Sequence, residues 1–421
     1  MEIIEGYEMA RDKILNELLE TLIVEEVKNL DKVDHAARAL KSAVMSKQYG
    51  IEDFLSRLIA EACIAVAPEG TAFNVDNVRV CKILGCGVEQ SHVVQGMVLK
   101  RQVEGTVSKV SDAKVAVYSC PVDIAATETK GTVLIKSAQE LLNFSSGEEN
   151  LLEQQIKGIS DAGVKVIVSG GKFGDMALHF INKYGLMAVR LLSKFDVRRV
   201  ASTVGARVLP RLEAPKKDDV GFCDEVYIDE IGDTSVVIMK QASHKSKIST
   251  IVVRGSTDNV MDDIERAIDD GVNTYKALTK DGRLLAGAGA VESELAVKVT
   301  SYSETLPGME QYSVQKFAES LQSLPASIAE NAGIKSHDIL LQLLAAHEKG
   351  DKNAAVDISV DVPKLINAVE NNIFDSYLMK YWGIKYATST ACTILSIDQI
   401  ICSKRAGGPK PREQGGDWDQ D

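Results

Sequence analysis

The spacing of apolar residues changes twice along this 421-residue chain, and that change constrains the fold more than any other feature. Residues 1–83 carry apolar side chains at the spacing of helices. From Gly85-Cys86-Gly87 to about Ile251, short β-branched runs alternate with helical segments, as in a parallel sheet covered on both faces. After Ser256 the spacing is helical again. The simplest explanation is an α/β domain inserted into a helical one, with hinges at Gly85–Gly87 and Gly255.

Individual elements follow from the same spacing and from the turn residues between them. The predicted helices are 7–29, one from Asp31, 52–65, 150–160, 174–183, 258–278, 290–299, 314–321, 337–347, 363–369 and 389–397. The predicted strands are 114–118, 164–168, 188–192, and a hairpin made of 226–228 and 236–239. Residues 405–421 are predicted to form a flexible polar tail.

Composition excludes several classes of partner. The formal net charge of −12 provides no basic surface for nucleic acid. No apolar run approaches the ~18–20 residues that a membrane span needs, and the acidic start of the chain is unlike a signal peptide. Seven scattered cysteines are typical of reduced thiols in the cytosol. We therefore expect a cytoplasmic protein with neither nucleic acid nor membrane as a partner.

Asp270 is the first candidate for chemistry. It lies on the predicted helix 258–278, nearly opposite the apolar stripe, which consists of Met261, Ile264, Ile268, Val272 and Tyr275. A carboxylate in this position can polarise water or help to hold a magnesium ion. The alternative is a solvated acidic face that Asp270 shares with Asp263 and that Arg266 partly neutralises. From the helix alone, the alternative is favoured.

A glycine turn, Ala286-Gly287-Ala288-Gly289, opens the next helix. The start of a helix presents unpaired N–H groups and a positive dipole end, which together suit a phosphate. The turn has neither the Lys-Ser/Thr of a P-loop nor the third glycine of a dinucleotide fingerprint, so in isolation a turn that lets two helices pack closely is the favoured interpretation. Asp375 is a further candidate, and its alternative role is a helix cap.

Ser169-Gly170-Gly171-Lys172 follows a predicted strand and opens a helix, so it is a second candidate for anion binding. An ordinary turn between strand and helix is the favoured interpretation. The sequence contains no Gly-x-Ser-x-Gly elbow, and none of its six histidines has a partner at metal-ligand spacing. Nucleophilic catalysis is therefore unsupported.

At these residues the chain resembles the group II chaperonins, and the resemblance runs from end to end. The stretches that carry it are Met45-Ser46-Lys47-Gln48-Tyr49-Gly50, Phe73-Asn74-Val75-Asp76-Asn77, Val117-Tyr118-Ser119-Cys120-Pro121, Glu128-Thr129-Lys130-Gly131-Thr132-Val133-Leu134-Ile135 and Arg254-Gly255-Ser256-Thr257-Asp258-Asn259. The resemblance implies a multidomain α and α/β fold with the group II chaperonin architecture. Helical equatorial and intermediate domains then carry an inserted α/β apical domain with a helical lid protrusion.

The resemblance also implies domain boundaries. They are equatorial 1–28 (a truncated N-terminal part) and 284–404, intermediate 29–85 and 252–283, apical and client-binding 86–251 with the protrusion at about 131–153, and a disordered tail at 405–421. The function implied is that of a subunit in a hetero-oligomeric double ring of paralogous chaperonin subunits. ATP, with Mg²⁺, drives closure of the lid over unfolded client proteins.

Residue by residue, the resemblance assigns Asp270 as the aspartate that activates the attacking water. Gly287, Ala288 and Gly289 match the turn beside the base and ribose of the nucleotide, and Asp375 matches the acidic residue that contacts the ribose. The family usually has Pro-Gly-Gly-Gly where this chain has Ala286-Gly287-Ala288-Gly289. The methyl group of Ala288 is therefore expected to crowd the ligand.

The family's phosphate loop, Gly-Asp-Gly-Thr, supplies the magnesium ligand and does not occur in this sequence. Ile231-Gly232-Asp233-Thr234 is not a substitute, because it falls in the predicted hairpin. Apolar residues at helical spacing begin at Ile3 without a capping residue, so we expect that an N-terminal part with the metal ligand is missing. We predict that this polypeptide alone does not hydrolyse ATP.

Three hypotheses remain open from the sequence. The leading one is a subunit of an ATP-driven protein-folding machine. The second is a small-molecule enzyme that holds a phosphorylated substrate at Ser169–Lys172. The third is an inert structural subunit that occupies a ring position without turning over ATP, which Ala288 favours and Asp270 argues against.

Overall fold

The computed structural model describes residues 2–67, 72–124, 137–241, 247–359, 362–404 and 407–408. Its α-helices are α1 (Glu2–Lys13), α2 (Val33–Met45), α3 (Glu52–Val66), α4 (Ala138–Asp161), α5 (Asp175–Lys183), α6 (Lys194–Val204), α7 (Asp258–Lys280), α8 (Ala290–Ser303), α9 (Met309–Leu321), α10 (Ser323–Asn331), α11 (Ser336–Glu348) and α12 (Tyr377–Leu395). The strands are β1 (Ile23–Glu26), β2 (Val78–Leu84), β3 (His92–Leu99), β4 (Lys109–Tyr118), β5 (Val166–Ser169), β6 (Met187–Arg190), β7 (Val208–Leu209), β8 (Gly221–Ile231), β9 (Thr234–Lys240), β10 (Ser249–Gly255), β11 (Arg283–Ala286), β12 (Ala354–Val356), β13 (Leu365–Asn367) and β14 (Phe374–Ser376).

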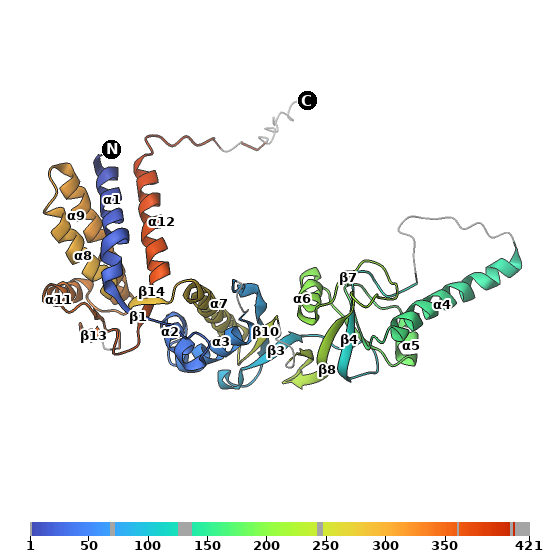
Figure 1. The fold of residues 1–421 in the computed structure, drawn as a ribbon. Helices are drawn as coiled ribbons and strands as arrows, with labels where there is room; N and C mark the ends of the chain where they lie inside the picture. The colour runs from blue at the N-terminus through green and yellow to red at the C-terminus, as the bar shows by residue number, and fades with distance from the viewer. Residues whose placement is uncertain are drawn as a thin grey trace, which may run out of the picture.

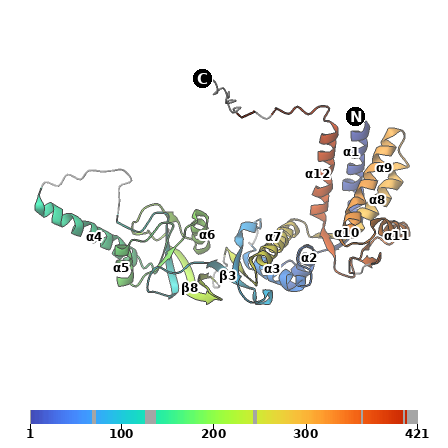
Figure 2. The same ribbon diagram turned by 180° about the vertical axis from the view of Figure 1, so that it is seen from behind.

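The molecule is elongated, with the first and last helices at the same end (Figure 1). Helices α1, α8, α9 and α12 occupy that end, and α4 reaches furthest from it. Between the ends, α2, α3 and α7 lie over strands β10 and β3 (Figure 2). Segments far apart in the sequence therefore meet at one end, as the helical, α/β, helical order predicted.

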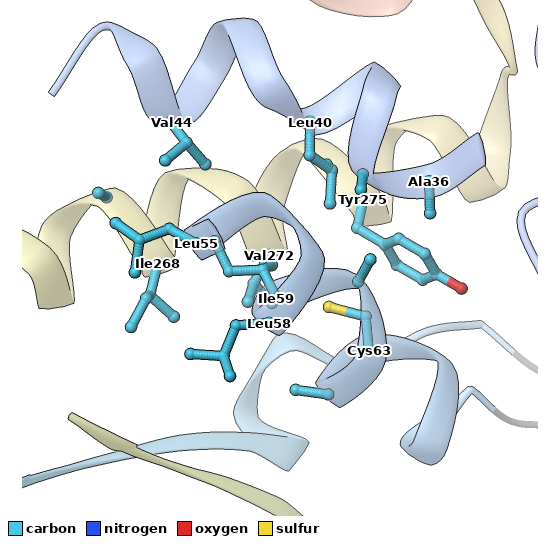
Figure 3. Close-up of a cluster of buried hydrophobic side chains, with 14 of the residues drawn as sticks. Ala36, Leu40, Val44, Leu55, Leu58, Ile59, Cys63, Ile268, Val272 and Tyr275 are labelled. Atoms are coloured by element: carbon cyan, nitrogen blue, oxygen red, sulfur yellow. The ribbon is translucent and has the colours of Figure 1, made fainter. Parts of the chain in front are cut away.

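Helices α2, α3 and α7 share one apolar core, and Figure 3 shows their side chains interdigitating. The predicted stripe of α7 is confirmed, because Met261, Ile264, Ile268, Val272 and Tyr275 are all buried. Helix α3 approaches α7 closely at Gly271, where a Cβ would lie 2.8 Å from Cδ1 of Ile59. This packing joins two segments of the chain that are about 200 residues apart.

The main sheet has nine strands in the order β2-β10-β3-β9-β8-β4-β5-β6, with β7 paired to β4. The prediction of a parallel sheet is wrong in part. Pairs β2–β10, β4–β5, β5–β6 and β4–β7 are parallel, whereas β3, β8 and β9 run antiparallel to their neighbours. The reason is the β8–β9 hairpin, which was predicted correctly and which reverses the chain at Gly232 (φ 63°). Helices cover both faces at β4–β6, with α6 on one face and α4 and α5 on the other.

Strand β3 connects the middle of the molecule to the far sheet. Its first half pairs with β10 and its second half with β9, and the change of partner occurs at Gly96. Gly96 has a φ of 130°, and a side chain there would overlap the carbonyl oxygen of Met239. The Gly85–Gly87 and Gly255 segments lie side by side at the ends of β2 and β10, where the Arg254 Nε donates to the carbonyl oxygen of Gly85 at 3.0 Å.

Two predicted helices need correction, and so does the helical interpretation of residues 1–83 at its end, where Val78–Leu84 forms β2. The helix predicted for 7–29 ends at Leu22, and Ile23–Glu26 forms β1, which pairs with β11. The helix predicted for 363–369 is wrong, because Leu365–Asn367 forms β13 and pairs with β12. In both cases a short strand partner elsewhere in the chain overrides the local apolar spacing. The remaining predicted helices and strands are present, with boundaries shifted by a few residues or, at 150–160 and 389–397, as parts of longer helices.

Some predictions fall wholly or partly outside the described residues. The motif Glu128–Ile135 lies outside them, as does the predicted tail at 405–421 apart from Gly407 and Gly408. The predicted protrusion at 131–153 begins outside them, and its residues from Ala138 onward belong to α4. The domain boundaries remain predictions.

Replacing Leu40 with alanine should destabilise the middle of the molecule by about 2–5 kcal/mol, because the fully buried side chain would leave a cavity among α2, α3 and α7. The measurement is hydrogen exchange of α3 and α7 amides across a urea series. Leu341→Ala, at a residue that is 57% exposed, is the matched control and should change stability by no more than about 0.5 kcal/mol. Equal losses in both variants would contradict the packing described.

Candidate functional site

The small sheet β1-β11-β14 brings the glycine turn and Asp375 together. Gly287 directly follows β11, and Leu285 in that strand pairs with Asp375 in β14. The amide of Gly287 also donates to the carbonyl oxygen of Ile373 at 2.9 Å. Two candidates that are almost 90 residues apart in the sequence therefore lie at one edge of the sheet.

The two glycines of the turn are required by packing. A Cβ on Gly287 would lie 3.0 Å from Cγ2 of Ile373, and one on Gly289 would lie 2.8 Å from Cβ of Pro325. Gly289 has a φ of 83° and precedes the first residue of α8. The alternative that the turn serves close packing is therefore supported, alongside any role in binding.

Ala288 has a φ of 53°, a conformation that costs energy for a residue other than glycine. It is only partly buried, and its carbonyl oxygen accepts a hydrogen bond from the amide of Val356 at 3.2 Å. Within the described part of the chain, no acceptor is found for the amides of Ala288 and Gly289. These two N–H groups at a helix start can receive an electronegative ligand atom.

Lys380 joins Asp375 to a second carboxylate, Glu292 in the first turn of α8. Its ammonium lies 3.0 Å from Asp375 Oδ2 and donates to Glu292 Oε1. Burial alone would lower the pKa of Lys380, but the two carboxylates outweigh it and raise that pKa above its ordinary value. The ammonium is thus held charged between them.

In each of the two carboxylates, only one oxygen contacts Lys380. The Oε2 of Glu292 is buried and has no hydrogen-bond partner among the described residues. Asp375 is about one-third exposed, and its Oδ1 can accept a hydrogen bond from a ligand hydroxyl. Asp375 is therefore an oriented acceptor, fixed from one side by Lys380 and open on the other. It does not cap α12, because that helix lacks a side-chain cap.

Asp270 lies apart from this edge. Its Oδ2 is 3.2 Å from the ammonium of Lys47, and both side chains are nearly half exposed. Arg266 pairs with Asp263 at 2.9 Å instead, so the acidic face of α7 is divided between two partners. No contact between Asp270 and the glycine turn or Asp375 is found among the described residues.

Helix α2 links the two groups. Its residue Ser42 donates a hydrogen bond to the carbonyl oxygen of Phe374, next to Asp375. Lys47 follows the end of the same helix and contacts Asp270. A displacement of α2 would therefore act on both places at once.

Sequence reasoning missed Lys47, Glu292 and Lys380 as site residues. Lys47 was present in the quoted stretch Met45–Gly50, but no rule of spacing connects it to Asp270, which is more than 200 residues away. Glu292 stands in the first turn of a helix, a common place for an acidic residue. A Lys five residues after a candidate Asp was the available signal for Lys380.

The second anion candidate, Ser169–Lys172, is filled by the protein itself. A Cβ on Gly171 would lie 2.5 Å from Cα of Pro121, so no room remains for a ligand. The amide of Gly171 donates to Ser169 Oγ, and Lys172 pairs with Asp123 at 3.3 Å. An ordinary strand-to-helix turn, the favoured interpretation, fits this geometry.

Over the described ranges, no group of three or more His, Cys, Asp or Glu side chains is arranged to hold a metal ion. None of the described helices is both long and apolar enough to cross a membrane. Gly232 and Asp233 form the β8–β9 turn, as expected, and Gly232 lies against Arg254 rather than near β11 or β14.

Comparison with known proteins gives consistent matches. The TCP-1/cpn60 chaperonin family matches residues 1–405. The T-complex protein 1 subunits theta of Bos taurus and Homo sapiens are each 55% identical over 420 residues, which is 100% of this chain and 76% of theirs. The subunit theta of Caenorhabditis elegans is 53% identical over 413 residues, covering 98% of this chain and 75% of its own length.

Among solved structures, the open-state monomer of a group II chaperonin from Methanococcoides burtonii is similar, with a TM-score of 0.69 and 27% identity. The match covers 94% of this chain and 92% of that one. The architecture predicted from the sequence is thereby confirmed.

Replacing Lys380 with methionine should destabilise the protein by about 3–5 kcal/mol, because the buried Glu292 and the partly exposed Asp375 would lose their counter-charge. The measurement is equilibrium urea unfolding. Adding Glu292→Gln to this variant should recover part of the loss. Lys316→Met removes an exposed ion pair with Glu319 and should cost no more than about 1 kcal/mol. A Lys380 variant as stable as the Lys316 control would contradict the assigned charge network.

Proposed function

Because this chain belongs to the TCP-1/cpn60 chaperonin family, and is therefore a chaperonin subunit that acts in protein folding, we propose that it is the theta subunit of the eukaryotic cytosolic chaperonin (TRiC, also called CCT). The observation that carries the proposal is the 55% identity to theta subunits along the whole chain. Its partners are then paralogous subunits in a hetero-oligomeric double ring and unfolded client proteins, and its location is the cytosol.

The domain assignment proposed from the resemblance agrees with the packing. The core of α2, α3 and α7 unites residues 29–85 with 252–283, which we assign to the intermediate domain. Helices α1, α8 and α9 share a second core that unites residues 1–28 with 284–404, the equatorial domain. Residues 86–251 then form the apical domain, in which α4 lies furthest from the equatorial domain (Figure 1).

We propose that the glycine turn and Asp375 bind the base and ribose of ATP. Two features of the structure fit this ligand. The amides of Ala288 and Gly289 have no acceptor among the described residues, and Asp375 presents one free carboxylate oxygen to a hydroxyl donor. Magnesium, bound with the phosphates, would supply the charge that stabilises phosphoryl transfer. The residues described here contribute to the nucleoside end of that site.

Asp270 is proposed as the general base that accepts a proton from the attacking water. The water oxygen then bonds to the γ-phosphorus while the bond to the leaving ADP oxygen breaks. Lys47 contacts the Asp270 carboxylate at 3.2 Å and helps to orient it. Asp270 makes no described contact with the glycine turn, which agrees with roles at opposite ends of the nucleotide, the γ-phosphate and the base with its ribose.

The proposed identity is tested by native mass spectrometry of the endogenous protein from a cytosolic extract. We expect this chain in a megadalton assembly together with paralogous chaperonin subunits. A small species containing this chain alone would mean that the resemblance records ancestry and that the ring role has been lost. The small-molecule hypothesis receives no support, because Pro121 fills the Ser169–Lys172 turn.

Replacing Asp270 with asparagine in the assembled ring should reduce ATP turnover at this subunit about 100-fold or more while leaving nucleotide binding intact. Azido-ATP cross-linked to this subunit, followed by measurement of the fraction hydrolysed, separates its turnover from that of its neighbours. Asp263→Asn removes an exposed carboxylate of the same helix and is the control, with no expected change. Unchanged turnover in the Asp270 variant would favour the inert structural subunit.

Replacing Ala288 with glycine should tighten nucleotide binding, because the methyl group that crowds the ligand and the strain of a positive φ both disappear. Gly287→Ala should weaken binding, since its Cβ would press on Ile373 and displace the turn. Dissociation constants for ADP and ATP, measured by fluorescence titration of the complex, test the pair. Weaker binding by Ala288→Gly would show that the methyl group supports the ligand.

A further inference from the structure

His347, in the last turn of α11, is completely buried, and both of its ring nitrogens face oxygen acceptors. Nδ1 lies 2.9 Å from Glu294 Oε2, and Nε2 lies 3.0 Å from the carbonyl oxygen of Ala354. A carbonyl oxygen and an ionised carboxylate only accept hydrogen bonds, whereas a neutral imidazole has a single N–H. With Glu294 ionised and His347 neutral, one ring lone pair would face an oxygen lone pair.

The arrangement therefore requires one proton more than a neutral histidine and a carboxylate. The proton makes His347 an imidazolium that donates to both oxygens, or it lies on Glu294 and is donated to Nδ1. Either form satisfies both contacts. The other charged groups that face the pair are Lys298, 3.4 Å from Glu294 Oε1, and Lys352, which lines the same cavity as Glu294.

The two oxygens that His347 joins belong to elements that hold the glycine turn from either side. Glu294 lies in α8, which begins directly after Gly289. Ala354 opens β12, and two residues later the Val356 amide donates to the carbonyl oxygen of Ala288. His347 thus fixes the separation of α8 and β12. The turn between them contains Ala288, whose positive φ persists only while its surroundings hold it.

We propose that His347 is a positioning residue for the nucleotide-binding turn, which it holds through its two contacts with Glu294 and Ala354. The importance of the turn for nucleotide rests on the function proposed above, whereas the clamp formed by these two contacts does not. When either contact is lost, the separation of α8 and β12 is no longer fixed and Ala288 is released.

Two substitutions separate the clamp from ordinary packing. His347→Gln keeps a polar side chain. At one of the two acceptors, however, the glutamine either presents its amide oxygen, which cannot donate, or is too short to make the contact. Glu294→Gln is the informative variant, because its amide N–H can donate to Nδ1 of a neutral imidazole while Nε2–H still donates to Ala354. Glu294→Gln should therefore keep the clamp closed. Lys298→Met controls for the lost lysine partner, and His337→Gln controls for an exposed histidine on the same helix.

The first readout is hydrogen exchange of the Val356 amide in the full-length chain, corrected for the intrinsic dependence on pH. His347→Gln should exchange about ten-fold faster or more, the factor that corresponds to losing a hydrogen bond to a charged group. Glu294→Gln should keep the protection of the wild type. Exchange of the Val252 amide in β10 reports whether a variant is folded.

Unchanged Val356 exchange in a folded His347→Gln variant would overturn the clamp. Faster Val356 exchange in a folded Glu294→Gln variant than in the wild type would overturn the role assigned to the Glu294 contact. Nucleotide titration of the complex is the second readout, in which His347→Gln should raise the dissociation constant and Glu294→Gln should not. Failure of the wild type to bind nucleotide would reject the proposed function alone, because the exchange experiment still decides whether the clamp exists.

Discussion

The apolar contact among α2, α3 and α7 is the constraint on which the rest of the molecule depends. It joins an N-terminal segment to one that follows about 200 residues later, and the intervening chain must therefore leave and return at the same place. Lys47 and Asp270 meet because α2 and α7 share this core, and Phe374 of β14 packs into the same cluster. The buried contacts that stabilise this core thus also set the distance between Asp270, the proposed base, and Asp375, the proposed ribose contact.

Charged contacts also fix the positions of the residues at the proposed site. Lys380 is buried between Asp375 and Glu292, so the acidic side chain at the sheet edge has a fixed orientation rather than several exposed rotamers. His347 has a similar role on the other side of the glycine turn. It joins α8 to β12 through its contacts with Glu294 and Ala354. The turn has little regular structure of its own, and these ionic contacts from neighbouring helices compensate for that.

Periodicity predicted the stripe of α7, the β8–β9 hairpin and the strands β4 to β6, because each of these elements carries its own signal of apolar spacing. It could not predict β1 or β13, which are short and depend on pairing with another strand, the distant β11 for β1 and the neighbouring β12 for β13. Asp270 illustrates the same limit at the site. Its helix alone favoured a solvated face, and the resemblance supplied the role that spacing could not. Lys380 and His347 escaped notice because their partners are brought to them by tertiary packing.

Strand β3 has a mechanical consequence. Its two halves are hydrogen-bonded to different neighbours, β10 and β9, so tension along the strand loads several hydrogen bonds in shear at once and stretches it little. At the junction, the Gly96 amide donates to the carbonyl oxygen of Ile248, and Thr250 Oγ1 donates to the carbonyl oxygen of Gly96. The strand therefore links β10 to β9 as one continuous piece, so that a displacement of β10 is passed directly to the far sheet.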